Sequence, residues 1–493
     1  MESKKVVTRF APSPTGFMHV GGVRTALYAW LWAKKNKGTF ILRIEDTDKE
    51  REVAGSIDHI IKSLKWLGIS WDEGPNIGGP HSPYLQSERL DLYKKYAQIL
   101  IDKGLAYPDP YTEEEVDQFR QKAELEKKPF LFRKHRPTST STSLGGPETF
   151  DKWDGTKPLR FKVSEIKSYK WNDLVYGDLS AGPEALDDFI LIKSNGFPTY
   201  NFAHIVDDIE MGVTHVMRGQ EFISSVPKFL SLYEALDLKP SLFVTLPPIM
   251  GEGGNKKLSK RDGAKDILEY KNEGYLAEAM INFLALLGWN PGDDREIFTV
   301  DELIKTFDIS RVGHSGAQWN DIKLDWINKE HIKKLSNEEL KKNIFAYLPE
   351  KLKDLIPQRP SLGTKDGLLS VILERISKWS DVKEMVQKGE LDFFYKTPEY
   401  FKEKLIYKNI NPEKISENIL QAITKLEKIE EKDFTQENIK IVLMLLADKL
   451  ENRGELLHPV RFALSGLDKS PDPFIIAEIL GKNETLLRLQ KAI

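Results

Sequence analysis

RFAPSPTGFMHVGGVR, residues 9–24, joins a strand-like run over residues 5–10 to a helical pattern of apolar residues. The order is strand, tight loop and glycine-opened helix. The first turn of a helix offers unpaired N–H groups and the positive end of the helix dipole, which favour a phosphate. Gly21 and Gly22 leave room for a phosphate or a flat ring against the backbone, and His19 can donate to a phosphate oxygen. The stretch therefore predicts a phosphate site, with an ordinary strand-to-helix connection as the alternative.

The composition is that of a globular protein with several domains. At 493 residues the chain is long enough for about three or four domains. It has no apolar run of the length a membrane span needs, and its first residues lack the apolar core of a signal peptide, so we expect a cytoplasmic protein. Cysteine is absent, which excludes disulfides, thiol nucleophiles and cysteine-ligated zinc. A net charge of −3 leaves nucleic-acid binding open.

Two further segments carry residues suited to a nucleotide site. A strand-like run over residues 38–44 ends in Glu45-Asp46, and α/β sheets bind ligands at the carboxyl ends of parallel strands. A glycine-flanked lysine cluster, KKLSKR, occupies residues 256–261. A solvated turn and a solvated loop are the respective alternatives. If these groups converge on one nucleotide, they suit phosphoryl or adenylyl transfer, in which an enzyme positions groups and stabilises charge on the phosphate.

The pattern changes along the chain. From residue 106, charged helical sequence and a polar tract (RPTSTSTSLGGPE) precede short strand-like pieces, and we interpret residues 106–187 as an insertion between two halves of an α/β core. Beyond residue 264 the pattern is almost wholly helical, without a solenoid repeat or a coiled-coil heptad run. Periodicity alone does not say whether the helical part binds a partner or supports the core.

The HVGG and KLSKR segments resemble the paired signatures of class I aminoacyl-tRNA synthetases. Longer stretches resemble the bacterial-type glutamyl-tRNA synthetases, which belong to class Ib. In chain order after the first motif, these stretches are FILRIEDTD, WDEGPNIGGPHSPYLQSERLDLY, FPTYNFAHIVDD, VTHVMRGQE, LLGWNPGDDREIFT, FDISRVGHSGAQWN, LHPVRFALSG and EILGKNETLLRL. They extend over the whole chain in the order of the family.

The resemblance implies an α/β fold whose catalytic core is a Rossmann-type parallel sheet, split by an insertion and followed by an all-α region. The core would comprise residues 1–105 and 188–250. Residues 106–187 would be the connective insertion that binds the tRNA acceptor end. Residues 251–336 would form a stem-contact region with the KLSKR loop, and residues 337–493 an all-α anticodon-binding region.

The resemblance also implies two adjoining substrate sites. Around glutamate it places Arg9, Ala11, Ser13, Glu45, Tyr200 and Arg218. Glu45 is the natural partner of the ammonium group, and Arg9 and Arg218 are natural partners of carboxylates. Around ATP it places His19, Gly21, Gly22, Lys257, Leu258, Ser259, Lys260 and Arg261. His19 and Lys260 would be catalytic, with Lys260 stabilising charge on the transferring phosphate.

The implied reaction is that of a ligase. L-glutamate and ATP, with Mg²⁺, would form glutamyl-adenylate, and the glutamyl group would pass to the 3′ end of tRNA-Glu. A monomer is expected. The chain departs from many relatives by lacking cysteine at 106–110, so no zinc and no protein metal site are predicted. A second departure is His204, which we interpret as a residue of the pocket wall.

Other functions remain open at this point. The main alternative is a non-discriminating enzyme that also charges tRNA-Gln. A tRNA-modifying relative lacks the helical region that this chain has. A catalytically inactive RNA-binding protein would not need the intact signatures, and a tRNA-independent nucleotidyltransferase would not need the insertion and the helical third.

Overall fold

A computed structural model describes residues 5–136, 153–251, 253–254, 256–258, 265–358, 367–408 and 410–493. Ser259, Lys260 and Arg261 of the predicted lysine signature lie outside these ranges. By their contacts the residues divide into two compact units. Unit 1 comprises Met1–Asn272 and Ala277–Leu324, and unit 2 comprises Glu273–Leu276 and Asp325–Ile493.

A six-stranded sheet forms the centre of unit 1, in the order β2-β1-β8-β9-β5-β6. Its strands are β1 (Val7–Phe10), β2 (Thr39–Leu42), β5 (Tyr169–Asp173), β6 (Gly177–Ala181), β8 (His215–Gly219) and β9 (Leu242–Leu246). All neighbours run parallel except β5 and β6, which are antiparallel. The register pairs Arg9 with Ile41 and Met217 with Val244. The central strands are short and mostly buried, as expected for parallel strands covered on both faces.

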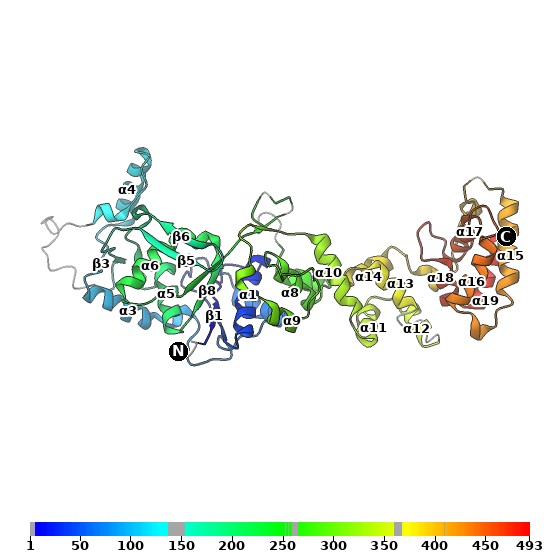
Figure 1. Cartoon of the computed structure of the whole chain (residues 1–493), viewed down its shortest axis with the longest axis horizontal. Helices are drawn as coiled ribbons and strands as arrows, with labels where there is room; N and C mark the ends of the chain where they lie inside the picture. Colours follow the sequence, from blue (N-terminus) through cyan, green and yellow to red (C-terminus); the bar gives the residue numbers. More distant parts are fainter. Residues whose placement is uncertain are drawn as a thin grey trace. The chain divides into compact units, whose positions relative to one another are not determined.

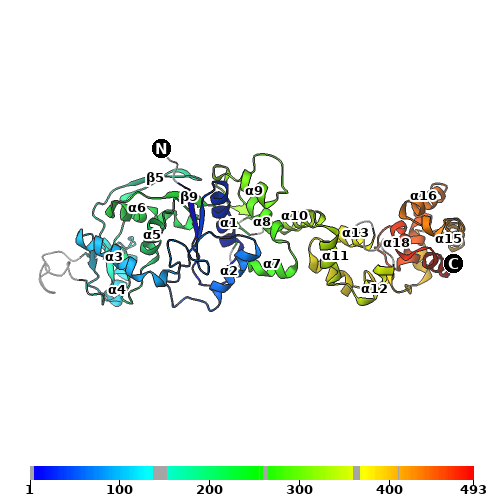
Figure 2. The same ribbon diagram turned by 90° about the horizontal axis from the view of Figure 1, so that it is seen from below.

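Two groups of helices cover this sheet (Figures 1 and 2). α1 (Val20–Lys35) packs on β1, β2 and β8, and contacts α8 (Ala277–Leu286) and α9 (Val300–Thr306). α3 (Leu90–Asp102), α5 (Tyr200–Glu210) and α6 (Val226–Ala235) contribute to a separate apolar cluster. Both views show the first group on one side of the central strands and the second group on the other. The predicted Rossmann-type parallel sheet is confirmed.

A smaller antiparallel sheet consists of β3 (Ala106–Pro108), β4 (Leu159–Phe161) and β7 (Ile190–Ile192), and α4 (Glu113–Leu125) follows β3 in the chain. Arg160 pairs with Asp109 at 2.6 Å, and Arg136 pairs with Asp188 at 2.5 Å, so ion pairs join its segments. The predicted insertion boundaries stay a prediction. Residues 106–187 contribute β5 and β6 to the large sheet, whereas β7, which follows this range, pairs with β4.

Unit 1 contains further elements outside the two sheets and their covering helices. They are α2 (Ser56–Trp66), the short pair β10 (Ile249–Met250) and β11 (Ala317–Gln318), and α7 (Ile267–Glu273), whose last residue belongs to unit 2. α10 (Asp321–Lys333) contains the division between the two units.

The described residues of unit 2 form helices without β-strands. The helices are α11 (Asn337–Phe345), α12 (Glu350–Gln358), α13 (Leu368–Arg375), α14 (Trp379–Gln387), α15 (Pro412–Leu426), α16 (Gln436–Ala447), α17 (Gly454–Ser465), α18 (Pro473–Leu480) and α19 (Lys482–Ala492). Their apolar faces share one core that runs from Ile332 to Ala492. The predicted all-α C-terminal region is confirmed. None of the helices in the described parts of the chain has the length and hydrophobicity needed to span a bilayer.

Candidate active site

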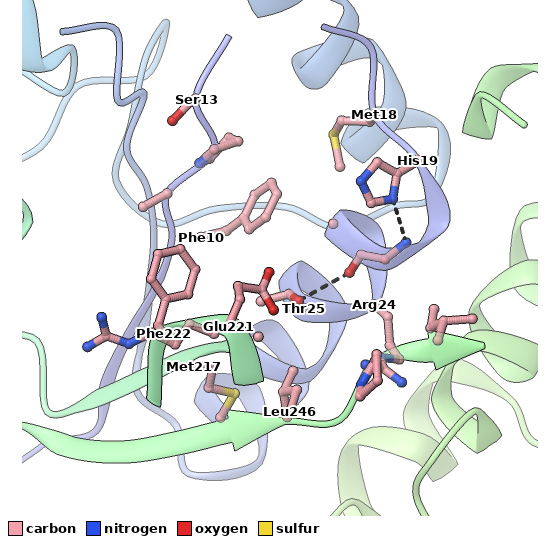
Figure 3. A pocket seen from close by; sticks show the side chains of 18 of the residues that line it. Phe10, Ser13, Met18, His19, Arg24, Thr25, Met217, Glu221, Phe222 and Leu246 are labelled. Carbon is pink, nitrogen blue, oxygen red and sulfur yellow. Dashed lines mark hydrogen bonds between the residues drawn. The ribbon is translucent and has the colours of Figure 1, made fainter. Parts of the chain in front are cut away.

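His19 caps the start of α1. Its Nδ1 accepts a hydrogen bond from the Gly21 N–H at 3.1 Å (Figure 3), so the proton of the neutral ring lies on Nε2. A Cβ at position 21 would lie 2.9 Å from His19 Cε1, and the capped geometry therefore requires glycine. A Cβ at position 22 would meet only the Phe10 ring, at an ordinary 3.9 Å. The described residues give no steric reason for Gly22, which is consistent with a ligand close to the helix start.

One cavity of about 740 Å³ lies at the carboxyl ends of β1, β8 and β9. Every predicted site residue that the structure describes lines this cavity: Arg9, Ala11, Ser13, His19, Gly21, Gly22, Glu45, Tyr200, Arg218, Lys257 and Leu258. They come from segments separated by up to 249 residues in the sequence, from Arg9 to Leu258, and the parallel sheet brings them to one edge. Their individual roles stay predictions.

Behind the cavity, arginines and carboxylates form a buried network. Arg9 donates from Nε to Asp208 Oδ1 at 3.0 Å and from Nη1 to the Met217 carbonyl at 3.2 Å. Arg43 donates to Asp208 at 2.8 Å and to Glu45 at 3.0 Å. Burial acts to raise the pKa of Asp208, but the charges of Arg9 and Arg43 outweigh it and hold that pKa below its ordinary value. Arg9 is thus engaged within the protein.

Glu45 lines the cavity beside the proline-containing loop. Its N–H donates to the Pro12 carbonyl at 3.0 Å, which holds that loop against the end of β2. Burial raises the pKa of the Glu45 carboxyl, and the charges of Arg43 and Arg9 offset this only in part. An additional cation in the cavity would stabilise the carboxylate. An ammonium group fits this requirement.

Arg218, on β8, is buried among aromatic rings. Its guanidinium carbon lies 4.8 Å from the centre of the Phe229 ring and 5.6 Å from that of Phe243. Nη1 has no hydrogen-bond partner among the described residues. A buried donor without a partner is costly, so this group differs from Arg9, which is paired within the protein.

Tyr200 lines the cavity next to Arg218, and His204 packs against Tyr200. Their rings stack with centres 4.7 Å apart, and His204 Nδ1 donates to the Tyr200 carbonyl at 2.7 Å. Burial raises the pKa of Tyr200 to about 12, so its hydroxyl remains a neutral donor. Burial, followed by the charge of Arg218, holds the pKa of His204 well below its ordinary value. From the sequence we interpret His204 as a residue of the pocket wall, but it does not itself line the cavity and lies behind Tyr200, which does.

The described part of the lysine signature lies at the cavity rim. Lys257 Nζ is 3.3 Å from Glu221 Oε1, and both side chains are more than half exposed. The Leu258 N–H donates to the Ile249 carbonyl at 2.7 Å, which anchors the signature on β10. The predicted roles of Ser259, Lys260 and Arg261 lie outside the described residues.

Sequence reasoning missed the residues that position the site. Asp208 and Arg43 were not assigned a role, although they hold Arg9 and Glu45 in place. The available signal was the pair Asp207-Asp208 at the end of an otherwise apolar stretch, NFAHIVDD. Two carboxylates on a buried helix need cationic partners.

Comparison with known proteins agrees with this geometry. Residues 5–326 match the catalytic domain of class I tRNA synthetases (E and Q), and residues 324–493 match an anticodon binding domain. The chain is 43% identical to the glutamate–tRNA ligase of Clostridium kluyveri over 99% of its own length and 98% of the relative. The chain belongs to the glutamate–tRNA ligase family. The Clostridium acetobutylicum member is 40% identical over 100% of this chain and 99% of the relative.

Two solved glutamate–tRNA ligase structures share the fold. The Elizabethkingia meningosepticum enzyme, crystallised in complex with its amino acid, has a TM-score of 0.81 and 36% identity, covering 99% of each chain. The Elizabethkingia anophelis synthetase has a TM-score of 0.79 and 35% identity, covering 99% of this chain and 100% of that one. The similarity to both family members includes the catalytic and the helical part.

Proposed function

We propose that this glutamate–tRNA ligase family member activates L-glutamate with ATP and transfers it to tRNA-Glu. The observation that carries the proposal is Arg218, whose buried Nη1 has no partner among the described residues and which lines the same cavity as the capped start of α1. One wall is suited to a carboxylate and the other to a phosphate. An acyl-adenylate formed from glutamate contains both a carboxylate and a phosphate, so it would match both walls.

Glutamate would bind through its charges. Arg218 would bind the side-chain carboxylate, because its guanidinium is buried and Nη1 is unpaired. Glu45 would bind the ammonium group, since the cation would offset the cost of burying its carboxylate. The remaining α-carboxylate would then face the α-phosphate of ATP at the start of α1.

The chemistry needs two displacements. An α-carboxylate oxygen attacks the α-phosphorus of ATP, and pyrophosphate leaves with the electron pair of the broken P–O bond. A ribose hydroxyl at the tRNA 3′ end then attacks the glutamyl carbonyl, AMP leaves, and the hydroxyl proton passes to solvent or to the AMP phosphate. His19, the N–H groups of α1 and the lysine signature would stabilise charge on the phosphates.

Magnesium would enter with the nucleotide. No group of three or more ligating side chains is placed to hold a metal ion in the part of the chain that the structure describes. Mg²⁺ commonly binds nucleotide phosphates and keeps several waters, so it fits this site as part of Mg·ATP. The absence of zinc, the monomeric state and the cytoplasmic location stay predictions.

The experiment that tests the proposal is aminoacylation with labelled glutamate. The full-length protein is incubated with Mg·ATP and either tRNA-Glu or tRNA-Gln. Charging of tRNA-Glu alone is the expected result. Charging of both would establish the non-discriminating alternative, and charging of neither would refute the proposed function.

A further inference from the structure

His59, on α2, contacts both the residues directly before the HVGG segment and Asp266, which follows the lysine signature in the sequence. The Met18 N–H donates to His59 Nδ1 at 3.3 Å, and His59 Nε2 lies 2.6 Å from Asp266 Oδ2. Phe17, on the cavity wall, stacks on the imidazole with ring centres 4.6 Å apart and an angle of 27°. The ring therefore contacts the residues directly before HVGG on one side and Asp266 on the other.

These contacts define the tautomer of the neutral ring. Because the Met18 N–H donates, Nδ1 must accept, and the proton of the neutral ring lies on Nε2. Nε2–H then donates to the Asp266 carboxylate. Ser63 Oγ is 3.4 Å from Nδ1 but donates at 2.7 Å to the His59 carbonyl, so Met18 remains the main donor to the ring.

Asp266 connects this ring to the segment after the lysine signature. Its Oδ1 accepts from the Leu268 N–H at 2.9 Å at the start of α7. The Ile267 N–H donates to the Met18 carbonyl at 3.0 Å, and His19 bridges to Asp266 as in an antiparallel pair. Met18 is thus held at its N–H by His59 and at its carbonyl by Ile267.

The arrangement places His59 behind the predicted ATP site. Met18 directly precedes the N-cap His19, and Asp266 lies five residues after Arg261 in the sequence. An error of about 1 Å in the placement of reacting groups can reduce a rate by about 100-fold. A single side chain that contacts both segments can therefore affect the placement of His19.

We infer that His59 is a positioning residue for adenylate formation, which aligns the helix start at His19 with the chain that leaves the lysine signature. This inference rests on the proposed function. His59 acts through the Met18 backbone and the Asp266 carboxylate, and it contacts neither substrate. The residues predicted to bind glutamate, Glu45, Tyr200 and Arg218, are not among the partners that the structure gives for His59.

A second histidine of unit 1 offers a matched control. His81 Nδ1 lies 2.7 Å from Glu73 Oε2, so it also forms a histidine–carboxylate pair. His81 does not line the cavity of the predicted active site. Replacing either histidine with alanine removes one such pair, but only His59→Ala also removes the contact with Met18.

The test measures ATP–pyrophosphate exchange by the full-length protein with tRNA-Glu present. The variants are His59→Ala, His59→Asn, His59→Gln and His81→Ala. Asparagine places an oxygen near the position of Nδ1 and can accept from Met18. Glutamine places an amide nitrogen near the position of Nε2 and can donate to Asp266. Thermal midpoints are measured in parallel.

We expect the loss of His59 to affect the kinetic parameters for ATP and for glutamate differently. His59→Ala should lower kcat/KM for ATP by about 10- to 100-fold, with the KM for glutamate unchanged, while Asn and Gln each recover part of the loss. His81→Ala should have the same kcat/KM for ATP as the wild type in the exchange assay, even if its thermal midpoint falls as far as that of His59→Ala.

Three results would overturn the inference. Wild-type kcat/KM for ATP in His59→Ala would show that the ring does not align the site. An equal loss in both histidine variants, or a KM for glutamate that rises by as much as kcat/KM for ATP falls, would show a purely structural effect. If the wild type itself shows no exchange, the proposed function fails and the inference with it.

Discussion

At the scale of single residues, the two arginines predicted to bind carboxylates have different environments. Arg9 donates to Asp208 and to a backbone carbonyl, whereas Arg218 lies among aromatic rings with Nη1 unpaired. The sequence indicated arginines at both positions but could not reveal this difference, because Asp208 lies about 200 residues from Arg9 in the chain. Arg218 is consequently the more informative site for mutation.

Replacing Arg218 with alanine should raise the KM for glutamate by about 10- to 100-fold, since a hydrogen bond to a charged group contributes about 1.5–3 kcal/mol. The KM for ATP should change little, because no predicted ATP contact is lost. Pyrophosphate exchange at varied concentrations of glutamate and of ATP measures both KM values. Arg295→Ala, at an exposed pair with Asp293, is the control. A glutamate KM that stays at the wild-type value would contradict the assignment.

His204 predicts a dependence of stability on pH. Its pKa is low in the folded protein and near 6.5 when unfolded, so between these values the unfolded chain binds the extra proton. The free energy of unfolding should therefore fall as the pH drops below 6.5, by up to about 1.4 kcal/mol per pH unit from this one group. Between pH 7.5 and 5.5, the free energy of unfolding should fall less in His204→Asn than in the wild type. Parallel losses in both proteins would argue against a buried neutral ring.

At the scale of elements, the start of α1 is explained by its residues. His19 accepts from Gly21, and glycine at position 21 avoids a clash with the His19 ring. Gly22 has no such reason within the described structure. The strand–loop–helix order and the closeness of its residues to one cavity follow from local pattern and parallel-sheet topology.

Gly22→Ala separates stability from ligand binding. Alanine should leave the fold intact or stabilise it by about 0.5–1 kcal/mol, because glycine is the poorer helix former. The new methyl group should raise the KM for ATP by about tenfold, equivalent to 1.4 kcal/mol, with the KM for glutamate as the internal control. Thermal unfolding and exchange kinetics measure the two effects. An unchanged ATP KM would place the nucleotide away from this turn.

The β5–β6 hairpin shows where sequence reasoning was insufficient. Tyr169–Asp173 alternates half-buried and exposed residues before the buried Asp173, a signal of a strand with one solvated face. Its parallel partner β9 lies about 70 residues later in the chain, at Leu242–Leu246. Local pattern can suggest such a strand, but it cannot assign the strand to the large or the small sheet.

At the scale of the whole molecule, the family models meet at residues 324–326 and the two units divide after Leu324. Both positions fall inside α10, through which the helical pattern continues without a break. Sequence reasoning placed its boundary at residue 337, where a charged turn interrupts that pattern. Helical periodicity reveals where a helix ends, and a change of packing partner within one helix leaves no such signal.

Arginines of the helical region are available as candidates for anticodon binding, but those that the structure describes in the following contacts are paired within unit 2. Arg375 pairs with Glu390 at 2.6 Å, and Arg453 pairs with Asp448 at 2.6 Å. Arg461 donates to the Leu467 carbonyl and to Ser470. Arg359 lies outside the described residues. These contacts give each of the three described arginines a structural role, so none is assigned to a base.

The family match of residues 324–493 predicts that the anticodon arm contributes to charging. The full-length protein should charge intact tRNA-Glu with a kcat/KM about 100-fold higher than a minihelix of the acceptor and T arms, which corresponds to about 2.7 kcal/mol of lost contacts. A minihelix from an unrelated tRNA is the control. Equal kcat/KM values for intact tRNA-Glu and for its minihelix would mean that the helical region does not contribute to recognition.

The central claim is that one cavity binds the glutamyl group and the adenylate together. A crystal structure with glutamyl-sulfamoyl-adenosine tests it most directly, because this analogue has a single free carboxylate. That carboxylate should lie about 2.9 Å from Arg218 Nη1, with the ammonium at Glu45 and the adenosine against Gly21 and Gly22. A carboxylate bound away from Arg218, or an adenosine bound away from the start of α1, would contradict the account.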